Sequence, residues 1–63
     1  MTQEELAIRL YEAAPLWDHA NVMGEYKRWP IAWGDLADYG ADGRAKEVAR
    51  KHAAVALAMM EEQ

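Results

Sequence analysis

Apolar positions near the start of the chain recur every three or four residues, which is the spacing of a helix that buries one face. The stretch before them has the pattern of a capping box, in which the Thr2 hydroxyl accepts a hydrogen bond from the amide of Glu5 and the Glu5 carboxylate accepts one from the amide of Thr2. Pro15 lacks an amide hydrogen and crowds the preceding turn, so the helix should end near Ala14. The pattern therefore predicts a first helix that begins at Thr2. Its buried face comprises Leu6, Ala7, Leu10, Tyr11 and Ala14.

The same spacing returns over a longer stretch after Gly40-Ala41-Asp42-Gly43. Asp42 is expected to cap the helix that follows, because an aspartate oxygen accepts from the free amides of a first turn. Glu47 and Lys51 lie four residues apart and form a favourable pair on the exposed side. The chain should thus end in its longest helix, and the alanines of its apolar arc allow another backbone to approach closely. The arc comprises Ala45, Val48, Ala49, His52, Ala53, Val55, Ala56, Met59 and Met60.

The middle of the chain has a less regular pattern. Pro15 suits the first position of a helix and Gly24 could close it, so residues 15–23 are expected to form a short second helix that shows Leu16, Ala20 and Met23 on one face. Residues 24–32 are interpreted as a connection. A single helical turn is expected between Trp33 and Tyr39, ended by Gly40.

Residues 29–36, which run from Trp29 to Leu36, are too apolar for a free linker, and Pro30 and Gly34 interrupt them too often for one long helix. We interpret this segment as an aromatic plug that fills the groove beside the alanines of the last helix. The predicted fold class is all-α: a compact single domain over residues 1–63, built from three helices or from four short ones.

Composition limits how such a domain can be stabilised. A chain of 63 residues buries only about 60% of the surface that its unfolded form exposes. Phenylalanine is absent and thirteen residues are alanine, so the six Trp and Tyr side chains must supply much of the burial. The absence of cysteine excludes disulfides and thiolate metal sites. Self-association remains one way to add buried area.

The formal net charge of −4 argues against duplex nucleic acid as a partner, because such binding depends on Lys and Arg that neutralise phosphates. The balance is uneven: residues 1–43 hold eight acids and three bases, whereas residues 44–63 hold four bases and three acids. The start of the chain is acidic, unlike a signal peptide, and no apolar run approaches the roughly 20 residues of a membrane span. We therefore expect a cytoplasmic protein without a membrane partner.

The residue types that usually carry catalysis are scarce. The sequence contains neither serine nor cysteine, and its only threonine is the capping residue Thr2. His19 and His52 are far apart, without the short helical spacing of metal-ligating pairs. We expect neither an enzyme nor a metal or other cofactor.

Aromatic and basic residues supply the candidates for a binding site. Exposed tryptophan, tyrosine and arginine contribute most to interface energies, and an aromatic ring flanked by cations suits a phosphate-bearing ligand or an acidic partner. Each candidate also has a simpler structural interpretation: the indoles as core, the basic residues as solvated, and the imidazole as partly buried and bonded to a carbonyl. The candidate residues are Arg28, Trp29, Trp33, Tyr39, Arg44 and His52.

Several short elements resemble a loose group of small proteins encoded by phages and high-GC bacteria. The shared elements are Glu5-Leu6-Ala7, Tyr11-Glu12-Ala13, a Pro-x-Trp-x-x-Leu motif formed by Pro30, Trp33 and Leu36, then Arg44, and finally Ala49 with Ala53. That group resembles a miniature ryanodine-receptor-type (RyR) repeat domain. The resemblance implies a compact helical unit and, in bacterial conflict systems, recognition of nucleotide-derived signals. Gly34 stands where the pattern has an acid.

Two functions are consistent with these observations. The first is a non-catalytic binding protein of phage or mobile-element type, which acts as an inhibitor, an anti-defence factor or an accessory protein by contacting a host protein or by forming a homo-oligomer. If a phage encodes it, it would act in the cytosol of the host cell. The second is a module that senses or sequesters a nucleotide-derived small molecule, with Trp29, Trp33 or Tyr39 stacked on the base and Arg28, Arg44 and His52 on phosphate or ribose.

Overall fold

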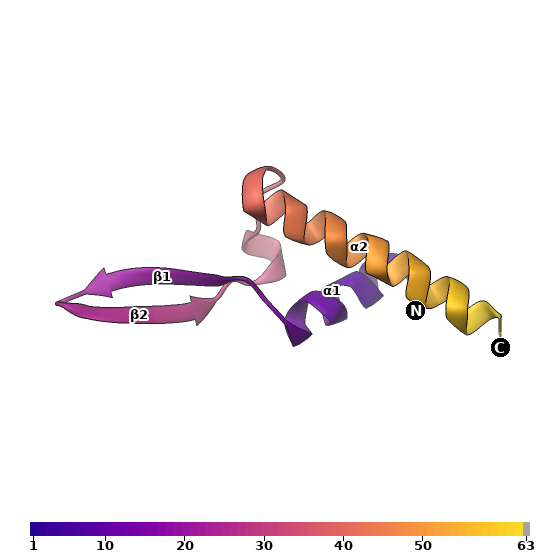
Figure 1. Cartoon of the computed structure of the whole chain (residues 1–63), viewed down its shortest axis with the longest axis horizontal. Coiled ribbons are helices and arrows are strands. Elements are labelled where there is room, and N and C mark those ends of the chain that lie inside the picture. Colours follow the sequence, from indigo (N-terminus) through magenta and orange to yellow (C-terminus); the bar gives the residue numbers. More distant parts are fainter. Residues whose placement is uncertain (63) are drawn as a thin grey trace.

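The computed structural model describes residues 1–62. Its elements, in chain order, are helix α1 (Gln3–Ala13), strands β1 (Trp17–Val22) and β2 (Glu25–Pro30), the 3-10 turn η1 (Trp33–Asp35) and helix α2 (Gly40–Glu61). The two helices lie against each other, and the two strands form an antiparallel hairpin that projects away from them (Figure 1). The described residues therefore have a mixed α and β fold, and the prediction of an all-α bundle is wrong.

The hairpin replaces the short helix predicted over residues 15–23. Its strands pair from Trp17 opposite Pro30 to Val22 opposite Glu25, and Met23 and Gly24 form a two-residue loop. Both loop residues have positive φ, 54° and 81°, as a type I′ turn requires to match the twist of the strands. Asn, Asp or Gly usually occupies the first of these positions. Because Met23 occupies the first position, the sequence lacks the usual signal for this turn.

Helix α1 follows its predicted pattern. The Thr2 hydroxyl accepts from the amide of Glu5 at 3.1 Å, and the amide of Thr2 donates to Glu5 Oε1 at 3.3 Å, so the capping box is confirmed. The helix ends at Ala13, directly before the residue that precedes Pro15. The chain then continues in an extended conformation into β1.

The start of α2 differs from the prediction. The helix begins at Gly40, and Asp42 lies within its first turn, where its carboxylate accepts from the amide of Ala37 at 3.1 Å. The Asp42 carboxylate therefore holds the preceding loop against the start of α2 by this hydrogen bond. The prediction that Asp42 caps the helix is wrong. A Cβ atom on Gly43 would lie 2.7 Å from the carbonyl carbon and oxygen of Asp38, so only glycine permits this close approach. The helical turn expected between Trp33 and Tyr39 is confined to η1.

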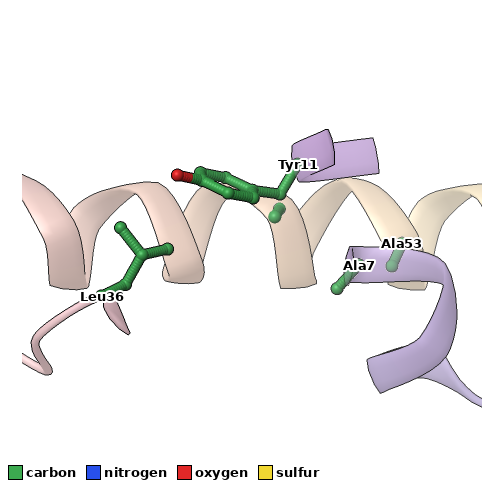
Figure 2. Close-up of a cluster of buried hydrophobic side chains, with 5 residues drawn as sticks. Ala7, Tyr11, Leu36 and Ala53 are labelled. Atoms are coloured by element: carbon green, nitrogen blue, oxygen red, sulfur yellow. The ribbon is translucent and has the colours of Figure 1, made fainter. Parts of the chain in front are cut away.

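The core is small and lies where α1 crosses the middle of α2. Figure 2 shows Ala7 and Ala53 at one end of the buried cluster, Leu36 at the other, and the Tyr11 ring between them. Of the nine residues on the predicted apolar arc of the last helix, Ala49 and Ala53 are buried. Of the predicted aromatic plug, Leu36 lies in the core and Trp33 packs against it. Trp29 instead belongs to β2.

The molecule is extended rather than compact. Its radius of gyration is 14.4 Å, against about 11 Å for a compact chain of this length. Its accessible surface is 4930 Å², against about 4,100 Å² for a compact monomer of its mass. About 800 Å² of surface is therefore exposed beyond what a chain of this size requires. No helix within residues 1–62 is long and apolar enough to cross a membrane.

Candidate functional site

A single buried tyrosine fixes the base of the hairpin. The Tyr11 hydroxyl donates to the carbonyl of Ile31, just after β2, and accepts from the amide of Leu16, just before β1, at 3.3 Å. The amide of Ile31 also donates to the carbonyl of Leu16 at 2.9 Å. Because Tyr11 projects from α1 into the core, these bonds connect the hairpin to the helical pair.

One face of the hairpin carries a row of stacked side chains. The Arg28 guanidinium lies 4.7 Å from the centre of the Trp17 ring, and the rings of His19 and Tyr26 lie 5.2 Å apart at 33°. These residues alternate along the strands and are diagonal neighbours across them, which is within reach of long and aromatic side chains. We call Trp17, His19, Tyr26 and Arg28 the hairpin ladder. It holds the two strands together without a core.

The opposite face of the hairpin is also open. It carries Trp29, which borders a hollow of about 320 Å³ together with three aspartates. Neither face packs on a helix or on η1, so the strand residues of the described hairpin are exposed; Ala20 alone is partly buried. The three aspartates are Asp18, Asp35 and Asp42.

Trp33 is partly buried and packs against the core of the helical pair. Its ring meets that of Tyr11 edge to face, with centres 5.6 Å apart. The Arg50 guanidinium and the Lys46 ammonium lie 5.6 and 6.0 Å from its centre. Arg50 also forms an ion pair with Glu4 at 3.0 Å. Trp33 thus connects η1 to both helices. Of its two interpretations, contact residue or core residue, this packing favours the structural one.

The remaining three candidates lie along α2. Tyr39 directly precedes the helix and is 80% exposed, and with Arg44 it borders a polar hollow of about 490 Å³. Arg44 and His52 border a separate apolar groove between the helices. The six predicted site residues therefore occupy three places: the hairpin, the edge of the helical core and the surface of α2. They do not line one common pocket in residues 1–62.

The apolar groove has a volume of about 460 Å³ and lies where α1 and the first half of α2 diverge. Leu10 and Val48 line it and remain exposed. Along α2 its floor continues as a row of residues at intervals of four, three, four, three and four. We call this row the α2 seam. It comprises Ala41, Ala45, Val48, His52, Val55 and Met59.

The shifted pKa values belong to structural contacts. The hydrogen bond from Arg50 lowers the pKa of Glu4 and raises that of Arg50. The hydrogen bond from the backbone amide of Thr2 lowers the pKa of Glu5 in the capping box. These groups hold α1 in place, and their shifts favour the charged forms. In the described part of the chain, no three acidic or imidazole side chains gather as metal ligands.

No protein-family model, curated protein or solved structure matches this chain. The resemblance to RyR-type domains therefore stays a prediction. In residues 1–62, the exposed large apolar side chains lie mostly on the hairpin and on α2.

Proposed function

We propose that this is a non-catalytic binding protein that acts by contacting another protein, and that the β1–β2 hairpin is the contacting arm. The observation that carries the proposal is the exposure of Trp17, Tyr26 and Trp29, at 42, 73 and 43%, on a hairpin that packs on no other described element. Large aromatic side chains are enriched where proteins bind each other. A lone two-stranded hairpin is also only marginally stable in water, so a bound partner would stabilise it.

The hairpin is preorganised for such a contact. The hairpin ladder and the hydrogen bonds to Tyr11 hold its shape and its direction in the free protein. Binding through a preformed arm loses less conformational entropy than binding that first orders a loop. This supports a surface that recognises a partner without rearrangement.

The outer edge of β2 is the more accessible of the two strand edges. In a hairpin with a two-residue loop, the pair beside the loop is hydrogen-bonded and the pairs then alternate, so the amides of Tyr26 and Arg28 face outward. On β1, the outward amide of His19 already donates to Asp18 Oδ1 at 2.8 Å. An extended segment of the partner would therefore add to β2 as a third strand.

The biological setting of this proposal comes from the sequence resemblance. The resemblance to small phage-encoded proteins favours a host protein as the partner, and binding would then take place in the cytosol of the host cell. An inhibitory, anti-defence or accessory role requires only binding, and it suits a chain that has no serine or cysteine nucleophile and whose one threonine, Thr2, is engaged in the capping box.

Photo-cross-linking in the cells that produce the protein tests the proposal. A benzophenone amino acid is placed at Tyr26 on the hairpin and, as the matched control, at the exposed Ala54 of α2. We expect a discrete protein adduct from position 26 that position 54 does not give. Equal labelling from both positions, or adducts from neither, would overturn the proposal.

The role of the outer edge of β2 is tested separately, with the partner that cross-linking identifies. The short chain is accessible to chemical synthesis, which allows a single backbone amide to be methylated while its side chain is kept. Methylation of the Arg28 amide should weaken binding at least tenfold, because it blocks the outer edge of β2. Methylation of the Asn21 amide, on the outer edge of β1, should leave binding unchanged. The reverse order would place the partner on β1.

A further inference from the structure

We infer that the α2 seam is the interface between two copies of this chain, which pair through an antiparallel contact between their α2 helices. The alternating spacing of four and three residues is the pattern by which two helices pack along their length. Val48, Val55 and Met59 on this seam are 42, 60 and 61% exposed, although they lie on an ordered helix. Exposed apolar side chains in a continuous row on an ordered helix are typical of an interaction surface.

Helix α2 extends beyond the part that α1 covers. It has 22 residues and is about 33 Å long, whereas α1 has 11 residues. After Ala53, no residue of the described helix is fully buried, and Val55, Met59 and Met60 are exposed. Two helical turns gain little stability on their own, since isolated short helices are marginal in water. A second helix against the seam would support them.

The seam is complementary to itself when one copy is reversed. With a twofold axis between Val48 and His52, Ala41 faces Met59 of the other copy and Ala45 faces Val55. Each alanine thus meets a larger residue, and at the centre Val48 faces His52. A twofold interface must be self-complementary in this way, whereas a different partner protein would impose no such symmetry.

The helix dipoles favour the same direction. In an antiparallel pair the amino end of each α2 helix lies beside the carboxyl end of the other, which is the favourable arrangement of two helix dipoles. A parallel pair would align the two dipoles unfavourably.

The seam contributes part of the surface that such a contact buries. A stable interface of standard size buries about 800 Å² per partner, and the half-exposed Val48, Val55 and Met59 lie in one row along α2. Leu10 and the apolar groove beside the seam would add to the buried area. The hairpins, which project from the end of the helical pair where α2 begins, would extend from opposite ends of the dimer (Figure 1).

Sedimentation equilibrium of the full chain tests the inference. We expect a mass of twice 7.1 kDa, and Val55→Glu should weaken the dimer at least tenfold because it places a charge in the seam. Ala54→Glu introduces the same charge one residue away, outside the seam, and should leave the dimer unchanged. Circular dichroism checks that both variants keep their helix content. A monomer at all concentrations, or equal weakening by both variants, would overturn the inference.

The chain lacks cysteine, so engineered disulfides report the direction of the helices without interference. A mixture of Ala41→Cys and Met59→Cys chains should form a mixed disulfide, while Ala41→Cys alone should not link to itself. Self-linking of Ala41→Cys, or absence of the mixed link, would overturn the antiparallel arrangement. Neither variant alters the hairpin, so the dimer and the hairpin contact can fail separately.

Discussion

The helical pair and the hairpin are stabilised by different means. The helices share a core in which small alanines allow close packing around one large ring, that of Tyr11. The hairpin has no core, and the stacked residues of the hairpin ladder with the hydrogen bonds at its base hold it. The comparison indicates that the helical pair is the scaffold and the hairpin the exposed arm, with Tyr11 as the link between them.

The largest effect is expected from Tyr11→Ala, because Tyr11 serves both regions. Removal of a large buried aromatic side chain costs about 3–5 kcal/mol, most of the stability of a domain this small. Circular dichroism should show loss of the helices as well as the strands. Tyr26→Ala removes an exposed tyrosine and should leave the helix signal intact. A folded Tyr11→Ala chain would mean that Tyr11 does not link the two regions.

Gly43→Ala should affect the scaffold alone. The added Cβ would lie 2.7 Å from the backbone of Asp38, so the loop must shift, at a cost of about 1–3 kcal/mol. Gly34→Ala is the matched control, since nothing lies within 4 Å of a Cβ there. Urea unfolding measures both variants. Equal destabilisation of the two would argue against the close approach at Gly43.

Tyr11→Phe should affect the hairpin more than the helices. It keeps the buried ring but removes the hydroxyl that bonds Leu16 and Ile31, at a cost of about 1–2 kcal/mol. Amide exchange should accelerate in β1 and β2 and stay unchanged in the middle of α2. Uniform acceleration throughout the chain would show that the two regions unfold as one.

Met23→Asn should stabilise the hairpin. Met23 has a φ of 54°, in the left-handed region, where asparagine is tolerated better than other non-glycine residues. We expect a gain of about 0.5–1 kcal/mol, measured as slower amide exchange in the strands. Met23→Ala relieves no strain and is the control. A gain of the same size from alanine would exclude turn strain as the cause.

The smallest effect concerns pH. The pKa of Glu4 is lowered below 4.5 in the folded chain by the hydrogen bond from Arg50, so its contribution to stability is present above that value. That contribution is lost as the pH falls through the folded-state pKa. The thermal midpoint should therefore decrease between about pH 5 and pH 3. Glu4→Gln should show a smaller decrease, with Glu5 still contributing; an unchanged pH profile would exclude the Glu4–Arg50 pair.

The sequence predicts those parts of the fold that have strong local signals. Thr2 and Glu5 define the start of α1, Pro15 its end, and the long apolar arc identifies α2. The hairpin lacks such a signal, because alternation of apolar and polar residues arises when one face of a strand is buried. Neither face of this hairpin is buried, and Pro15 and Gly24 bracket its first strand as they would bracket a short helix.

The site residues depend on packing that a sequence does not specify. Arg28 and Trp29 were predicted as contact residues and lie on the exposed arm, whereas Trp33 is partly buried against the core. Composition does not distinguish Trp29 from Trp33, since each is an indole within three residues of Pro30. The spacing of apolar residues predicted the apolar arc of α2. Which residues of that arc stay exposed depends on the length of α1 and on where it crosses α2.

Amide exchange of the chain bound to its cross-linked partner tests most directly the claim that the protein acts through the hairpin. The account predicts that exchange at the outward amides of Tyr26 and Arg28 slows at least tenfold on binding, while exchange at Asn21 on the other edge does not change. Unchanged exchange at Tyr26 and Arg28, with slowing confined to the helices, would contradict it.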